Sequence, residues 1–406
     1  ALTFVAAHEV GHTLGLRHNF KSSSATPFDQ LNNKQVIEEI GMTGSVMDYP
    51  TPNVAKDSSR QGYYYTPNVG TGDVWAITWG YKPVDGATAE EQMKALEPIA
   101  AECVAKTHLY GTDEDTYPMG ALDPRSNIND LSDNPMLWAT ERMSICNDLL
   151  MGGKLDGRVV APGEDYVPLR NAVTTLFLQK YVCANVATKN IGGAYTERAH
   201  KGDGKMPFTP VAAEDQRKAL AFVVQNALKS DNFELPPDML NMMQDDKMWS
   251  WENNLFQPGR RFDFPLATWV EAMQTGVLFN LMNPYLQARV VDGEYRADDA
   301  FKLSELYGTL TREIWTANAM PKGRTATWDR NLQRTYTDML IHQVVEPYPV
   351  TPDEAVALSR LNLTRIRGVA QAALASKGLD DATNAHLMET IARIDRALDA
   401  RREANF

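Results

Sequence analysis

The segment HEVGHTLGLRH, residues 8–18, decides how the start of this chain folds. Three of the seven histidines fall within these eleven positions, at spacings of four and then six residues. On an α-helix, residues i and i+4 lie on the same face, so His8 and His12 can direct their imidazoles at a single ion. Gly15 lacks a Cβ atom and can adopt the left-handed conformation that ends a helix and reverses the chain. His18 can then return as a third ligand.

Glu9 is predicted to lie beside this group. Adjacent residues of a helix are about 100° apart, so its carboxylate can accept a proton from metal-bound water. Three neutral imidazoles and one open position describe a catalytic zinc site, whereas a structural site closes with a fourth protein ligand. The pattern predicts Zn²⁺ held by His8, His12 and His18, with Glu9 as the general base. The remaining four histidines are interpreted as ordinary core or surface residues: His108, His200, His342 and His386.

A second feature is the segment SVMDYP, residues 45–50. It places Met47 twenty-nine residues after His18, with Tyr49 two residues further on. A thioether is a soft and poor ligand for zinc, so Met47 is better interpreted as an apolar floor beneath the histidines.

Together the two features resemble the metzincin clan of zinc endopeptidases, whose HExxHxxGxxH pattern is followed by a tight turn containing Met, the Met-turn. In the Met-x-Tyr branches of that clan the tyrosine approaches the metal and hydrogen-bonds the oxyanion. The resemblance therefore implies a catalytic role for Tyr49, and the alternative is a tyrosine packed behind the turn. The segments GLRHNF (15–20), VMDYP (46–50) and DVWAITWGY (73–81) are similar to a bacterial family of large secreted or envelope zinc-dependent metalloproteases.

The resemblance also implies a domain layout. Residues 1–85 are expected to form the lower, C-terminal half of a metzincin catalytic domain, and residues 86–406 a helical region with room for two subdomains. In metzincins a twisted sheet precedes the zinc helix and roofs the cleft, but only seven residues precede His8 here. We therefore expect an upstream part of the same protein to complete the cleft, and this chain alone to be a poor peptidase. Periplasmic or secreted localisation is implied by the same resemblance.

Helical spacing of apolar residues dominates the chain after residue 88, which predicts a mainly α fold with few short strands. A strand is expected at residues 191–196. A capping box is expected at Thr351 and Glu354, with Pro352 in the first helical position. The predicted helices span residues 89–104, 135–150, 166–186, 213–228, 267–282, 300–317, 327–345, 352–375 and 381–400.

Composition excludes several classes of protein. The formal net charge is -12, so nucleic acid is an unexpected partner, because affinity for it comes largely from Lys and Arg. No apolar run approaches the roughly 18 residues of a membrane span. The three cysteines form no C-x-x-C pair, and at most one internal disulfide can join two of Cys103, Cys146 and Cys183.

Two further segments allow a functional and a structural interpretation. The acidic run at residues 113–133 can be a calcium site, but it fits no EF-hand spacing, and a solvated loop is favoured. The methionine-rich stretch at residues 236–251 can be an adaptable surface, and core filling is favoured.

The function predicted first is a zinc-dependent endopeptidase acting on peptide or protein substrates. The alternative from another class is a non-catalytic helical binding or scaffolding module with a vestigial metal site. A zinc amidase shares the metal chemistry and differs in substrate. A Glu third ligand is disfavoured, because His18 already stands at the required position.

Overall fold

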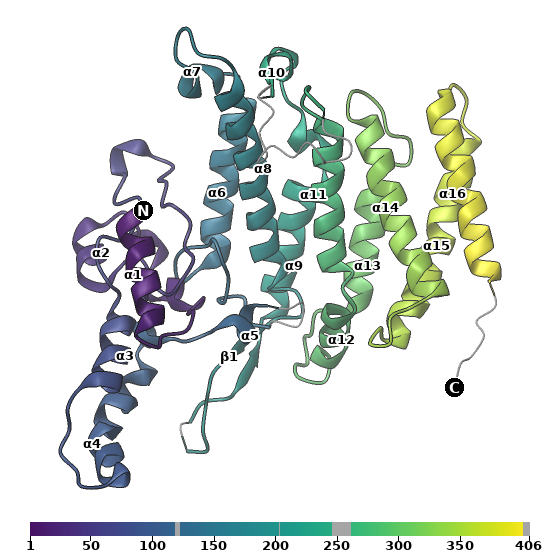
Figure 1. Cartoon of the computed structure of the whole chain (residues 1–406). Coiled ribbons are helices and arrows are strands. Elements are labelled where there is room, and N and C mark those ends of the chain that lie inside the picture. The colour runs from purple at the N-terminus through teal and green to yellow at the C-terminus, as the bar shows by residue number, and fades with distance from the viewer. Residues whose placement is uncertain (118–121, 203, 246–260, 401–406) are drawn as a thin grey trace. The chain divides into compact units, whose positions relative to one another are not determined.

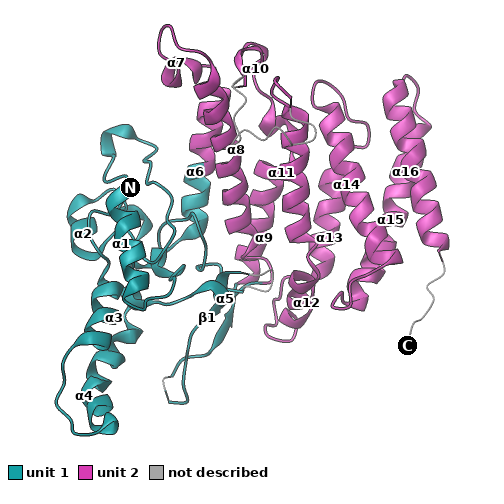
Figure 2. Cartoon of the chain, viewed as in Figure 1, with its two compact units in different colours: residues 1–142, 193–211 teal, residues 143–192, 212–406 magenta. Residues whose placement is uncertain are grey.

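The structure is a computed structural model and describes residues 1–117, 122–202, 204–245 and 261–400. It divides into two compact units, of which unit 1 comprises residues 1–142 and 193–211, and unit 2 comprises residues 143–192 and 212–406 (Figure 2). The boundary expected at residue 85 therefore falls inside unit 1.

Unit 1 is made of short helices joined by long irregular segments (Figure 1). Its α-helices are α1 (Leu2–Thr13), α2 (Lys34–Ile40), α3 (Thr71–Tyr81), α4 (Ala89–Ala101), α5 (Asp113–Thr116) and the first half of α6 (Pro135–Met151). Its 3-10 turns are η1 (Ser22–Ala25), η2 (Phe28–Gln30), η3 (Ser58–Arg60), η4 (Glu102–Val104) and η5 (Lys106–His108). An antiparallel hairpin pairs β1 (Ala194–Thr196) with β2 (Phe208–Pro210), and Tyr195 lies opposite Thr209.

All regular elements among the described residues of unit 2 are helices, which confirms the prediction of a mainly α chain. Besides the second half of α6, its α-helices are α7 (Asp156–Val159), α8 (Val167–Thr188), α9 (Ala213–Val223), α10 (Pro237–Met242), α11 (Leu266–Leu281), α12 (Pro284–Gly293), α13 (Leu303–Thr311), α14 (Ala326–Val345), α15 (Asp353–Leu374) and α16 (Asp381–Asp399). Two π-helical turns, η6 (Val224–Leu228) and η8 (Arg312–Thr316), continue α9 and α13, and η7 (Ser230–Phe233) is a 3-10 turn.

The long helices of unit 2 lie side by side, each packed on its neighbours (Figure 1). Helix α11 packs against α8 and α14, and α14, α15 and α16 contact one another. The core between α8, α10 and α11 buries Phe177, Met239, Met243 and Val270. Core filling, the favoured interpretation of the methionine-rich stretch, is thus confirmed for its first part, while its residues from 246 onward lie outside the described chain.

The predicted capping box at the start of α15 is wrong. The helix begins at Asp353, so Pro352 is the residue before it and has an extended conformation. The N–H of Thr351 donates to the carbonyl oxygen of Tyr348 (2.9 Å), and the Thr351 hydroxyl is buried with no partner among the described residues. Thr351 therefore belongs to the preceding turn, one residue too early to cap the helix.

Two other expectations can be compared with the structure. The three cysteines are thiols, and no disulfide joins them within the described residues. None of the helices that the structure describes has the length and apolar character needed to cross a membrane. Strand β2 and helix α12 were not predicted, because a three-residue strand and a single short amphipathic helix leave little periodic signal.

His386 is a buried polar residue at the interface of α16 with α14 and η8. Its Nε2–H donates to Oε1 of Gln333 (2.9 Å), and its ring stacks on Trp315 at 5.5 Å between centroids. The other ring nitrogen, Nδ1, is buried with no partner among the described residues. Burial, reinforced by the nearby charges of Arg334 and Arg330, lowers the pKa of His386 to about 4.

This burial predicts a pH-dependent stability. Between pH 6.5 and about 4 the unfolded chain binds a proton at His386 that the folded chain does not, so the free energy of unfolding falls as pH falls through this window. The loss is roughly 3 kcal/mol at most, from about 1.4 kcal/mol for each pKa unit. Urea unfolding at pH 7 and pH 4.5 should show a smaller difference for His386→Gln than for wild type. His342→Gln, at an exposed position, should keep the wild-type difference, and an unchanged difference in His386→Gln would contradict the assignment.

Candidate metal centre

Helix α1 ends just after His12, and the chain then reverses at Gly15. Gly15 has φ +84°, the left-handed conformation predicted for it. Its N–H donates to the carbonyl oxygen of His12 (3.0 Å), and the N–H of Leu16 donates to that of Gly11 (3.0 Å). This pair of bonds is the Schellman motif, which satisfies carbonyls at a helix end. The reversal returns His18 to the face of α1 that carries the other histidines.

The structure brings the three predicted ligands together. One possible ligand atom from each of His8, His12 and His18 lies within 4.8 Å of the others. Their ring centroids are 4.8 to 5.4 Å apart. Nitrogen ligands of one tetrahedral zinc lie roughly 3.3 Å apart, since each Zn–N bond is about 2.0–2.1 Å. A small inward movement of the imidazoles is therefore enough to enclose an ion.

Backbone carbonyls orient the first two imidazoles. Nδ1 of His8 lies 2.7 Å from the carbonyl oxygen of Val46, and Nδ1 of His12 lies 3.0 Å from that of Leu16. A carbonyl oxygen can only accept, so each Nδ1 carries the proton and donates it. Each Nε2 is then left with a lone pair, which is the form in which a neutral imidazole binds a metal.

A carboxylate orients the third imidazole. Nδ1 of His18 lies 2.9 Å from Oδ1 of Asp113 on α5, and an ionised carboxylate also only accepts. The pKa of Asp113 is held below its usual range: burial opposes this, but the hydrogen bond and charge of His18 outweigh burial. When the imidazole of His18 is neutral, its Nε2 is therefore also left with a lone pair.

The residues present fit a bound metal ion. Nε2 of His8 is buried and has no hydrogen-bond partner among the described residues. Burial is the main cause that lowers the pKa of His8, so this imidazole is neutral. A buried lone pair without a donor costs free energy, and an ion at the centre of the three imidazoles removes that cost.

The turn containing Met47 lies under α1. Met47 is buried, and a Cβ atom added to Gly11 would clash with its Sδ. The turn is attached to α3 through Asp73, whose carboxylate accepts from the N–H of Val46 (2.7 Å) and from the hydroxyl of Ser45. Asp73 thereby fixes the same residue whose carbonyl orients the first histidine.

The next residue of the turn, Asp48, is fully buried. Its carboxylate accepts from the hydroxyl of Ser22 (2.8 Å) and the N–H of Ser23 (2.9 Å), in the segment that follows His18. Burial raises the pKa of Asp48 well above its usual range, and the charge of Asp130 adds to this. The turn is thus held on one side by α3 and on the other by the segment after the third histidine.

Tyr49 lies at the metal-binding face. Its hydroxyl is 2.8 Å from Nε2 of His18 and donates to that lone pair, and 41% of the residue is exposed. Its ring centroid is 5.0 Å from that of His8. Tyr49 therefore lies against two of the three imidazoles, and its catalytic role stays a prediction.

Glu9 is exposed on α1, next to His8 in sequence. Its negative charge acts on the site: burial is the main cause that raises the pKa of Tyr49, and the charge of Glu9 is the next. The charge of Glu9 therefore acts on the tyrosine hydroxyl.

Sequence reasoning missed the roles of Asp113 and Asp73. Asp113 was named only as part of the acidic run, for which a solvated loop was favoured. That interpretation is wrong for two other members, Asp123 and Asp130, which are each 1% exposed. The acidic run has no periodicity that separates buried carboxylates from exposed ones. The sequence therefore contained no signal for the role of Asp113 or of Asp73.

This fold and this site define a mainly α protein with a three-histidine candidate metal centre. The chain belongs to the Met-zincin family, whose model matches residues 1–322. The membership supports a zinc metallopeptidase-like function and extends the predicted likeness well beyond the first 85 residues. No curated protein and no solved structure matches the chain.

The close approach of Met47 to α1 predicts the effect of Gly11→Ala. The new Cβ forces the thioether or the helix to move, and overpacking of this kind costs roughly 1–3 kcal/mol. Thermal melting should show a lower Tm, and titration should show weaker zinc binding. Gly80→Ala is the matched control, because Gly80 is also helical and its Cβ would meet nothing within 4 Å. An equal Tm for the two variants would refute this packing role.

Proposed function

We propose that this protein is a zinc-dependent endopeptidase in which Glu9 is the general base. The observation that carries the proposal is the convergence of His8, His12 and His18 with each Nδ1 hydrogen-bonded to an acceptor. Membership of the Met-zincin family supports it independently. A zinc ion bound there supplies a Lewis acid that polarises a carbonyl and lowers the pKa of water.

The side chains around the imidazoles have separate tasks. Glu9 is exposed on α1 next to His8, and we expect it to accept a proton from the attacking water and return it to the leaving amine. Tyr49 presents a hydroxyl that lies 2.8 Å from Nε2 of His18 and can donate instead to the oxyanion of the tetrahedral intermediate. Because this hydroxyl now occupies the lone pair of His18, we expect it to swing aside when the ion binds.

The substrate class follows from the same proposal. A peptide or unfolded protein is the expected substrate, and hydrolysis is expected in the periplasm or outside the cell. Fractionation of cells that produce the full-length protein tests the localisation, and recovery in the cytoplasm would contradict it.

The decisive comparison is between wild type and Glu9→Gln in the full-length protein. Glu9→Gln removes the base and leaves the three imidazoles in place, so kcat should fall on the order of 10²–10⁴-fold on a peptide library. Zinc content, measured by atomic emission, should stay unchanged. Glu39→Gln, which neutralises an exposed carboxylate on α2, should cleave as wild type does. Equal cleavage by Glu9→Gln and wild type would remove Glu9 from the mechanism, and zinc binding without any cleavage would favour the scaffolding module.

A further inference from the structure

Helix α5 lies against the site through an unusual set of contacts. Three consecutive acidic residues contact basic residues of other segments, and Arg17 lies within reach of two of them, at 3.7 Å from Asp113 and 2.7 Å from Glu114. The pairs are Asp113 with His18 (2.9 Å), Glu114 with Arg17 (2.7 Å) and Asp115 with Arg198 (2.9 Å). The acidic run is therefore an attachment between segments that lie about a hundred residues apart in sequence.

His18 needs such an attachment more than the other two ligands do. His8 and His12 are carried by α1, whose backbone fixes where their side chains begin. His18 lies beyond the end of that helix, in a segment without regular secondary structure. Its imidazole direction is therefore set by what its ring contacts, and the acceptor at its Nδ1 is Asp113.

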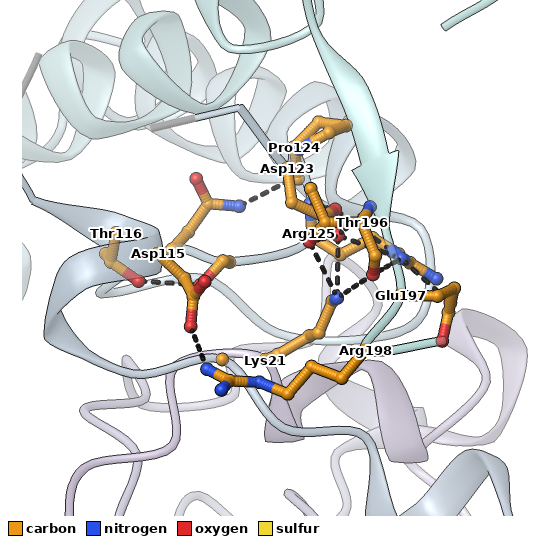
Figure 3. A network of polar contacts seen from close by, with 12 residues as sticks. Lys21, Asp115, Thr116, Asp123, Pro124, Arg125, Thr196, Glu197 and Arg198 are labelled. Carbon is orange, nitrogen blue, oxygen red and sulfur yellow. Dashed lines mark hydrogen bonds and ion pairs between the residues drawn. The ribbon is translucent and has the colours of Figure 1, made fainter. Parts of the chain in front are cut away.

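Asp113 is itself held in place by the rest of α5. The N–H of Thr112 donates to Oδ2 of Asp115 (2.9 Å), which closes the first turn of the helix. At the other end the Thr116 and Ser126 hydroxyls are 2.6 Å apart. Figure 3 shows Arg198 reaching Asp115 from the hairpin side.

A buried ionic cluster fixes the segment that carries His18. Nζ of Lys21 lies 2.7 Å from Oδ2 of Asp123 and donates to the carbonyl oxygen of Thr196 in β1 (2.7 Å). Arg125 binds both oxygens of the same carboxylate (Figure 3). Lys21 and Asp123 are 3% and 1% exposed. Breaking a buried ion pair costs free energy. The cluster therefore fixes the chain at Lys21, three residues after His18.

We propose that Asp113 is a positioning residue for the metal centre, which fixes the His18 imidazole as the third ligand. Its carboxylate holds the proton on Nδ1, directs Nε2 toward His8 and His12, and makes the imidazole a stronger base. Outer residues of this kind typically change metal affinity 10–100-fold. The inference rests on the three-histidine site of the proposed function and not on peptide hydrolysis. Measurements of metal binding alone can therefore test it.

Competition with a chromophoric chelator measures the zinc dissociation constant of the whole chain for four proteins. Asp113→Ala should weaken zinc binding on the order of 10–100-fold, because the acceptor is lost. Asp113→Asn should weaken it less, because the amide oxygen still accepts from Nδ1. Glu114→Gln removes one negative charge from the same helix without touching a ligand, and should bind as wild type does.

The Co²⁺-substituted proteins give a second readout that a merely structural role would not move. Asp113→Ala should alter the visible ligand-field bands, whereas Glu114→Gln should keep the wild-type spectrum. Circular dichroism of the metal-free proteins shows whether each variant is folded. A folded Asp113→Ala that keeps wild-type zinc affinity and an unaltered cobalt spectrum would overturn the inference, as would equal losses in Asp113→Ala and Glu114→Gln. Loss of peptide cleavage alone bears on the proposed function and not on the positioning role of Asp113.

Discussion

The hydrogen bond between Nδ1 of His8 and the carbonyl oxygen of Val46 is the interaction on which the site depends. It joins the helix that carries the first two ligands to the turn beneath it. Val46 also donates its N–H to Asp73, so α1, the turn and α3 meet at one residue. Met47 follows at once and packs where Gly11 leaves room. Any change that moves this turn therefore changes the direction of a ligand as well as the packing of the helix.

The two units are stabilised in different ways. Unit 1 buries polar and charged groups near the site, among them Asp48, Asp73 and Lys21, and each is held by donors or acceptors. Buried charges of this kind add little net stability, but they penalise alternative arrangements because an unpaired buried charge is costly. Unit 2 also buries polar groups, such as Lys180 and Gln333, and in addition packs the apolar faces of long helices, as around Phe177 and Val270.

Local pattern predicted the features that depend on short spacings. The nine predicted helices of the later chain were found with ends that differ by a few residues, because apolar periodicity reports on a buried face directly. The reversal at Gly15 was also predicted, because it depends only on the backbone conformation of that residue. The capping box at Thr351 failed because a spacing of three residues does not say where the helix begins. Asp113 could not be found in this way, because its partner lies 95 residues earlier.

The sequence by itself predicted the three imidazoles, the glutamate beside them and the helical character of the chain, because each depends on spacings within a short segment. Only the tertiary structure decided which acceptors orient those imidazoles, where Tyr49 points and what the acidic run does. These depend on contacts between segments that are far apart in the chain. A hydrogen bond forms only when donor and acceptor have a suitable distance and direction. The order of residues does not specify either quantity when a long loop separates the two partners.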